Sequence, residues 1–219
     1  LRARWKLMGQ ISLGFLAVYF GFSIESIEGP FFQKMDLGFW AIPLSVLWIV
    51  GIINAINLID GLDGLASGIT LVILITLSWL AHEMGKIELM LLMVVLIGSV
   101  VSFLSFNRPP ASIFMGDSGS YFLGYLIAIL SIWVCEKPTG TVSLFPLLIL
   151  AVPIIDTTFS IFRRFLKGIP FYSADKDHLH HRLLAKGLTP TQAVFILSGF
   201  SIIYGSLALS ANYFPEIQS

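Results

Sequence analysis

The chain has 219 residues, of which 56% are hydrophobic and 12% are charged. A soluble domain carries roughly 25% charged residues, so this composition indicates an integral membrane protein with several spans. The net charge is zero and no segment is strongly basic, which argues against a nucleic-acid-binding domain. The single cysteine, Cys135, excludes a disulfide framework and a cysteine-based zinc site.

Seven apolar stretches are long enough, or nearly so, to cross about 30 Å of hydrocarbon as helices. We expect helices over residues 11–27, 39–59, 65–82, 87–106, 118–135, 142–162 and 193–211. No Gly/Ser linker, low-complexity run or internal repeat interrupts them. The sequence therefore predicts one all-α domain over residues 1–219, a polytopic helical bundle in a membrane.

The charged residues sort to the two sides of this bundle. With seven spans the connecting segments alternate, and one side then receives ten of the thirteen lysines and arginines. That side is predicted to be cytoplasmic. It also receives most of the aspartates and three of the four histidines, whereas a transporter is expected to carry its polar groups near the bilayer midplane. The pattern favours a reaction at the cytoplasmic membrane surface.

The stretch NAINLIDGLDGLASG, residues 54–68, places polar side chains at a predicted span end. On a helix Asn54, Asn57 and Asp60 lie within an arc of about 120°. The glycines that follow loosen the backbone, so Asp60 and Asp63 can turn toward one ligand. The alternative is a helix end followed by a tight Asp-Gly turn, which does not account for Asn54 and Asn57. Polar groups at membrane depth are costly, which favours a functional site.

The second motif, FNRPPASIFMGDSGSYFLG, spans residues 106–124. Asp117 lies where the chain re-enters the membrane and is a candidate metal ligand, and Arg108 is a candidate phosphate contact. Alternatively, Asp117 caps the next helix. Three small residues spaced four apart predict a helix-packing face: Gly116, Ser120 and Gly124.

The third motif, PFYSADKDHLHHRLLAKGLT, spans residues 170–189 in the longest cytoplasmic loop. Its cations suit a phosphate-handling loop, because they would offset the charge of a pyrophosphate. These candidates are Lys176, His178, His180, His181 and Arg182. A solvated loop and a zinc site are the alternatives, although adjacent histidines do not readily reach one metal ion.

The three aspartates of the first two motifs, Asp60, Asp63 and Asp117, together predict a divalent cation. Alone they would repel a phosphorylated substrate, whereas Mg²⁺ binds carboxylate and phosphate oxygens together. The metal would neutralise charge on a transferred phosphoryl group. The sequence therefore predicts metal-assisted phosphoryl chemistry on a membrane-embedded acceptor. Asp156 has two interpretations: it pairs with Arg163 or Arg164, or it lines the same site.

The three motifs, in this order on one side of a polytopic chain, resemble the bacterial polyprenyl-phosphate N-acetylhexosamine-1-phosphate transferases. The resemblance implies transfer of N-acetylhexosamine 1-phosphate from a UDP-sugar to undecaprenyl phosphate, with release of UMP. It also implies Mg²⁺ or Mn²⁺ and a place at the cytoplasmic face of the bacterial inner membrane, at the start of cell-envelope polysaccharide synthesis such as that of O-antigen. The segment HLHHRLL looks like the branch that uses N-acetylglucosamine (GlcNAc).

The motifs and the resemblance together predict roles for individual residues. Asp117 and Asp60 are the expected metal ligands. The expected catalytic residues are Asp60, Asp63, Asp117, His178, His180 and His181. The expected substrate-binding residues are Asn54, Asn57, Arg108, Lys176 and Arg182.

One departure concerns the segment with Lys6, Leu7 and Gln10, which resembles a KL..Q segment of the family. The family carries an Asp-Asp pair shortly before it, so we expect that pair upstream of Leu1. We also expect further N-terminal spans and a last span outside this chain, which alone would be inactive.

Two other functions stay open at this point. The sister enzyme, phospho-N-acetylmuramoyl-pentapeptide transferase, shares the aspartate-rich stretches. From another class, the protein would be a non-catalytic polyprenyl-phosphate binder or a transporter of a lipid-linked sugar. The oligomeric state, a homodimer included, is also open.

Overall fold

The computed structural model describes residues 3–29, 32–168 and 178–213 of the chain. Its helices are α1 (Ala3–Tyr19), the 3-10 helix η1 (Gly38–Trp40), α2 (Ala41–Ile59), α3 (Leu65–Glu83), α4 (Ile87–Asn107), α5 (Gly116–Cys135), α6 (Phe145–Ile149), α7 (Ala151–Leu166), α8 (Leu179–Ala185) and α9 (Pro190–Tyr213). Its strands are β1 (Ser26–Gly29), β2 (Phe32–Asp36) and β3 (Thr141–Ser143). The prediction of a predominantly helical, polytopic membrane protein is confirmed.

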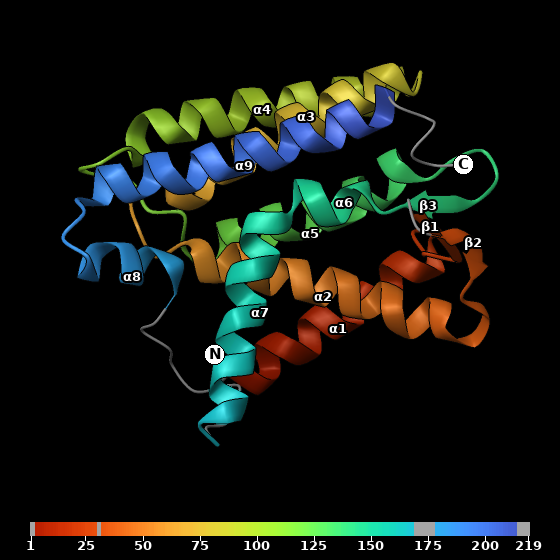
Figure 1. Cartoon of the computed structure of the whole chain (residues 1–219), viewed down its shortest axis with the longest axis horizontal. Helices are drawn as coiled ribbons and strands as arrows, with labels where there is room; N and C mark the ends of the chain where they lie inside the picture. The colour runs from red at the N-terminus through yellow and green to blue at the C-terminus, as the bar shows by residue number, and fades with distance from the viewer. Residues whose placement is uncertain (1–2, 30–31, 169–177, 214–219) are drawn as a thin grey trace.

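Helix α3 forms the centre of the bundle. It packs against α4 and α9 on one side and against α5 and α2 on the other, and the three helices α3, α4 and α9 lie side by side in Figure 1. Its apolar residues recur on all faces, and Leu65, Ile69, Ile73 and Leu77 are fully buried. Of its membrane-spanning window 67% is buried by protein, against 17% for α4, so α3 is the more central of the two helices.

Helices α2 and α5 approach each other closely at Gly124. A Cβ atom added at Gly124 would lie 2.8 Å from the Cα of Ile53, so only glycine fits at this crossing. Ser120, one turn earlier on α5, is fully buried and accepts a hydrogen bond from Asn57 of α2. The predicted small-residue packing face is therefore confirmed for Ser120 and Gly124. It does not include Gly116, where an added Cβ would meet open space.

A three-stranded sheet closes the opposite end of the bundle from α8 (Figure 1). Strand β1 lies in the middle, antiparallel to β2 and parallel to β3. Lys86 lies at the same end and donates hydrogen bonds to the carbonyls of Trp133, Val134 and Glu136. These carbonyls lie at the end of α5, where no further helical N–H reaches them. The sheet was not predicted from the sequence.

Five of the described helices are long and apolar enough to cross a membrane, where the sequence predicted seven spans. The first expected span differs because α1 ends at Tyr19 and the chain continues into β1. The sixth is interrupted at Leu150, which separates α6 from α7. Pro153 explains this break, because it has no N–H to donate to the carbonyl of Ile149.

The α2–α5 crossing gives a test of the packing. We expect Gly124→Ala to lower the free energy of unfolding by about 1–3 kcal/mol, because the added methyl group meets the backbone of Ile53. Gly98→Ala on α4 is the matched control, since a Cβ there meets no atom within 4 Å. Thermal unfolding in detergent measures both. A melting temperature of Gly124→Ala equal to that of the control would contradict the close approach.

Candidate active site

The end of α2 and the start of α5 bring two polar motifs together. Nδ2 of Asn57 donates hydrogen bonds to Oδ1 of Asp117 at 3.2 Å and to Oγ of Ser120 at 2.8 Å. Asn57 and Asp117 are 60 residues apart in the chain, and the α2–α5 crossing at Gly124 makes this contact possible. Two residues that the sequence assigned to one site therefore touch in the structure.

Lys6 of α1 forms an ion pair with the carboxylate of Asp117, and its ammonium lies 6.0 Å from the ring centroid of Tyr121. Both side chains remain partly exposed, Lys6 at 31% and Asp117 at 52%. Lys6 therefore places a positive charge among the aspartates. The sequence did not identify it as a site residue, because it lies 111 positions from its partner.

Asp60 caps the C-terminus of α2, close to the start of α5. Burial, and to a smaller extent the negative charges of Asp117 and Asp63, raise its pKa to about 6, whereas a backbone hydrogen bond from Gly116 opposes the shift. Asp60 therefore lies within electrostatic reach of both Asp63 and Asp117. That the three form one site stays a prediction.

Asp63 and Asn107 hold the turn between α2 and α3 against the loop that follows α4. Oδ2 of Asp63 accepts a hydrogen bond from the backbone N–H of Ala111 at 2.9 Å. Oδ1 of the buried Asn107 accepts from the Gly64 N–H at 3.1 Å and from the Ser67 hydroxyl at 2.8 Å. The Asn107 amide also donates to a carbonyl of the loop, at residue 113, at 2.9 Å. Asn107 was missed by the sequence analysis, although an asparagine before Arg-Pro-Pro at a helix end was a usable signal.

The histidine motif is anchored from α7. Its first histidine, His178, precedes α8, and its Nδ1 lies 3.0 Å from Oδ2 of the buried Asp156. Oδ1 of Asp156 accepts the backbone N–H of Leu179 at 2.7 Å. For Asp156, this geometry favours the predicted alternative in which it belongs to the site.

His180 lies against the α2–α3 turn. A Cβ added at Gly61 would lie 2.4 Å from Nε2 of His180, so the imidazole occupies the space beside this glycine. The ring is 2% exposed, is parallel to that of His178 at 5.8 Å, and has no hydrogen-bond partner at Nε2. Burial, then the nearby His181, lowers the pKa of His180 to about 4, so this ring is neutral at pH 7.

The remaining predicted residues lie around this centre. Asn54 forms an amide pair with Gln10 of α1, donating to its Oε1 at 2.8 Å, and so contacts α1. Arg108 follows α4 beside Gly64 and is exposed, as is Arg182 on α8. His181 packs its ring 4.2 Å from that of His180. Lys176 lies outside the described residues.

Asp60 and Asp117 are the candidate metal ligands. Within residues 3–29, 32–168 and 178–213, no group of three or more His, Cys, Asp or Glu side chains is arranged to hold a metal ion. Magnesium, however, is commonly bound by only one or two carboxylates together with substrate phosphates. Asp60 and Asp117 fit that arrangement, because their mutual repulsion would be relieved by a divalent cation. For the described histidines, the structure offers no comparable arrangement for zinc.

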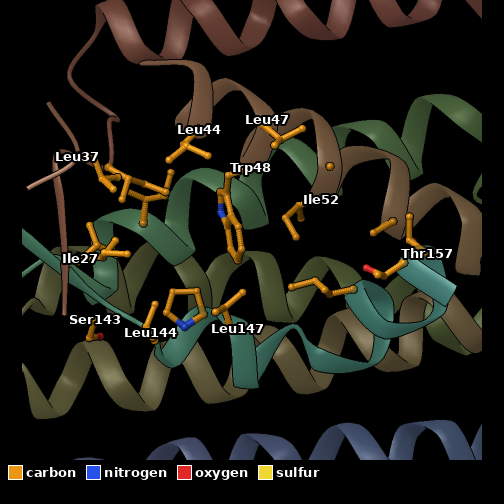
Figure 2. A pocket seen from close by; sticks show the side chains of 18 of the residues that line it. Ile27, Leu37, Leu44, Leu47, Trp48, Ile52, Ser143, Leu144, Leu147 and Thr157 are labelled. Atoms are coloured by element: carbon orange, nitrogen blue, oxygen red, sulfur yellow. The ribbon is translucent and has the colours of Figure 1, made fainter. Parts of the chain in front are cut away.

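An apolar pocket of about 520 Å³ lies between α2, α6 and α7. Figure 2 shows Ile27 and Leu37 at one end of it, Thr157 of α7 at the other, and the Trp48 ring projecting into it from α2. The Trp48 indole N–H donates to Oγ of Ser131 at 3.2 Å, which fixes the ring. The pocket therefore shares α2 with the polar site.

Fold and site together define a polytopic helical membrane protein with an aspartate- and histidine-rich site at one end of the bundle. The family model described as glycosyl transferase family 4 matches residues 1–135. The chain belongs to this family, which confirms the predicted relationship.

Three relatives show how far the similarity extends. The chain is 44% identical over 211 residues to a protein of Bacillus subtilis named probable undecaprenyl-phosphate N-acetylglucosaminyl 1-phosphate transferase, covering 95% of this chain and 59% of the relative. It is 38% identical over 116 residues to the decaprenyl-phosphate N-acetylglucosaminephosphotransferase of Mycobacterium leprae, covering 48% and 29%. It is 33% identical over 116 residues to the undecaprenyl-phosphate alpha-N-acetylglucosaminyl 1-phosphate transferase of Thermotoga maritima, covering 53% and 38%. The chain thus spans less than two thirds of the length of these relatives.

The raised pKa of Asp60 predicts a pH-dependent stability. Between about pH 4, the ordinary aspartate value, and pH 6 the folded protein binds more protons than the unfolded chain, so stability falls as pH rises. Asp60→Asn removes this effect, and we expect it to melt at a higher temperature than wild type at pH 7. The difference in melting temperature between Asp60→Asn and wild type should vanish near pH 4.

Thermal unfolding in detergent with a chelator present measures this difference. Asp36→Asn, an exposed aspartate on β2 at the opposite end, is the matched control. An Asp60→Asn variant that is no more stable than wild type at pH 7 would contradict the raised pKa of Asp60.

Proposed function

We propose that this protein transfers GlcNAc 1-phosphate from UDP-GlcNAc to undecaprenyl phosphate at the cytoplasmic face of the inner membrane. An oxygen of the lipid phosphate forms a bond to the β-phosphorus of the nucleotide sugar. The bond from that phosphorus to the bridging oxygen breaks, and UMP leaves. The product would start a cell-envelope polysaccharide.

One observation supports the proposal: a cluster of polar side chains and an apolar pocket share helix α2. Asn57 and Asp60 lie at its C-terminal end, beside Asp117 and Lys6. Trp48 and the apolar pocket lie farther along the same helix. A lipid phosphate needs both environments, one at each end of the molecule. The names of the relatives, each a polyprenyl-phosphate acceptor enzyme, support the same assignment.

The charges of the site suit the reaction. Asp60 and Asp117 would hold Mg²⁺ or Mn²⁺, which supplies positive charge for the phosphates when it is bound. Lys6 contributes a further cation beside Asp117. The exposed Arg108 follows α4, and the exposed Arg182 lies on α8. Asn57 orients the Asp117 carboxylate through its amide hydrogen bond. His180, neutral and buried, borders the turn that carries Asp60.

The names of the relatives favour UDP-GlcNAc over UDP-N-acetylmuramoyl-pentapeptide as the sugar donor. A non-catalytic binder or transporter of a polyprenyl-linked sugar is the alternative of another class. The two classes differ in whether UMP is released. A homodimer stays a prediction.

The first test uses the complete polypeptide in detergent with undecaprenyl phosphate, UDP-GlcNAc and Mg²⁺. We expect UMP release that requires both lipid and metal. Asp117→Asn should reduce it about 100-fold, because the site loses the charge that holds the cation, a loss of about 2.7 kcal/mol in transition-state stabilisation. Asp36→Asn is the control and should remain active.

Two outcomes would contradict the proposal. UMP release from UDP-N-acetylmuramoyl-pentapeptide but not from UDP-GlcNAc would favour the sister reaction. No release from either nucleotide, with polyprenyl phosphate still binding at equilibrium, would favour the non-catalytic class.

The pocket gives an independent test of the lipid. Gly51 lines it from α2, and a Cβ there meets no atom within 4 Å, so a larger side chain would enter the pocket without a backbone clash. We expect Gly51→Leu to raise the KM for undecaprenyl phosphate about tenfold, equivalent to about 1.4 kcal/mol, and to leave the KM for UDP-GlcNAc unchanged. Gly98→Leu is the matched control, because its Cβ is equally unobstructed but lies outside the pocket. Equal lipid KM values for the two variants would exclude the pocket as the tail site.

A further inference from the structure

Asp156 is a buried carboxylate in the middle of α7, 3% exposed. Both of its oxygens are used by the histidine motif: Oδ2 by Nδ1 of His178 and Oδ1 by the backbone N–H of Leu179. An ionised Asp156 would only accept hydrogen bonds and would hold the proton of His178 at Nδ1. One side chain therefore contacts both the His178 ring and the first residue of α8.

A chain of direct contacts leads from Asp156 to the aspartate site. The ring of His178 is parallel to that of His180, with centroids 5.8 Å apart and an angle of 3° between them. His180 in turn fills the space beside Gly61, the residue that follows Asp60. A shift of His178 would therefore be passed to the turn that carries Asp60, because buried rings have little free space around them.

The same stretch of α7 faces the apolar pocket. Ile154 and Thr157, two residues before and one residue after Asp156, line that pocket. The helix thus contacts the proposed tail site with these residues and the histidine motif with Asp156.

We propose that Asp156 is a positioning residue of the transfer reaction, which fixes His178 and the start of α8 so that His180 lies against the α2–α3 turn. This inference rests on the proposed transferase function. A purely structural anchor would affect the amount of folded protein but leave the rate per folded molecule unchanged. A positioning residue affects that rate.

The experiment replaces Asp156 with asparagine in the complete polypeptide. Asparagine keeps an oxygen for the Leu179 N–H but loses the charge that holds the Nδ1 proton. We expect kcat per folded enzyme to fall about 10- to 100-fold, the range found for carboxylates that orient metal-bound histidines, with the KM values for both substrates unchanged. Asp36→Asn, the same chemical change on an exposed strand, is the matched control.

A second readout does not depend on activity. Carbethoxylation of His178 and His180, followed by mass spectrometry, reports how well the two buried rings are held. We expect Asp156→Asn to react faster at both, and Asp36→Asn to react as wild type does. If wild type proves inactive, the transferase proposal fails, whereas this readout still decides whether Asp156 holds the histidines.

Gly61→Ala displaces His180 from the other side and leaves Asp156 intact. We expect a comparable loss of kcat, with the double variant Asp156→Asn/Gly61→Ala no worse than the more impaired single variant, because both disturb one contact. Wild-type kcat in Asp156→Asn, unchanged histidine reactivity, or additive losses in the double variant would each overturn the proposal. If Asp156→Asn does not accumulate as folded protein, the Gly61→Ala variant decides, and a wild-type kcat in that variant would overturn the proposal.

Discussion

The close approach of α2 and α5 at Gly124 is the contact on which the site depends. Without a side chain at Gly124, the backbone of α5 reaches Ile53 of α2, and one turn further on Asn57 reaches Ser120 and Asp117. A wider crossing would separate Asn57 from Asp117, because a side-chain amide spans only a few ångström. Interhelical distances of 8–10 Å depend on the side chains at the contact. A packing constraint in the apolar interior thus sets the geometry of polar groups at the membrane surface.

The polar groups of the site are largely satisfied by one another. Asn107 uses its oxygen for Gly64 and Ser67 and its amide for the loop after α4, and Asp156 uses both oxygens. A buried polar network is stable only when its members are paired. Nε2 of His180 is an exception among the described side chains of the site. This unpaired nitrogen is buried against Gly61, in the turn that follows Asp60.

The sequence predicted the parts of the site that depend on local pattern. Asn57, Asp60 and Asp117 were identified because polar residues at span ends are costly, and the structure brings them together. Lys6 and Asn107 were missed because their partners lie far along the chain, 111 and 43 residues away. The strands were not predicted because each has only three to five residues, too few for a recognisable alternation of polar and apolar residues. Pro153 was a sequence signal for the break at Leu150, but a search for apolar stretches does not detect it.

Helix α2 carries polar and apolar sites at fixed positions along one rigid axis. Ala55, at the near end of the pocket, precedes Asp60 by five residues, and Leu44, at the far end, precedes it by sixteen. At 1.5 Å per residue the pocket therefore extends from about 8 to about 24 Å from the level of Asp60. If this pocket takes the tail of the proposed acceptor, a prenyl chain too short to cover that interval would leave the wall around Trp48 and Leu44 without contact. The fixed spacing along α2 would then make the length of the tail a determinant of lipid binding.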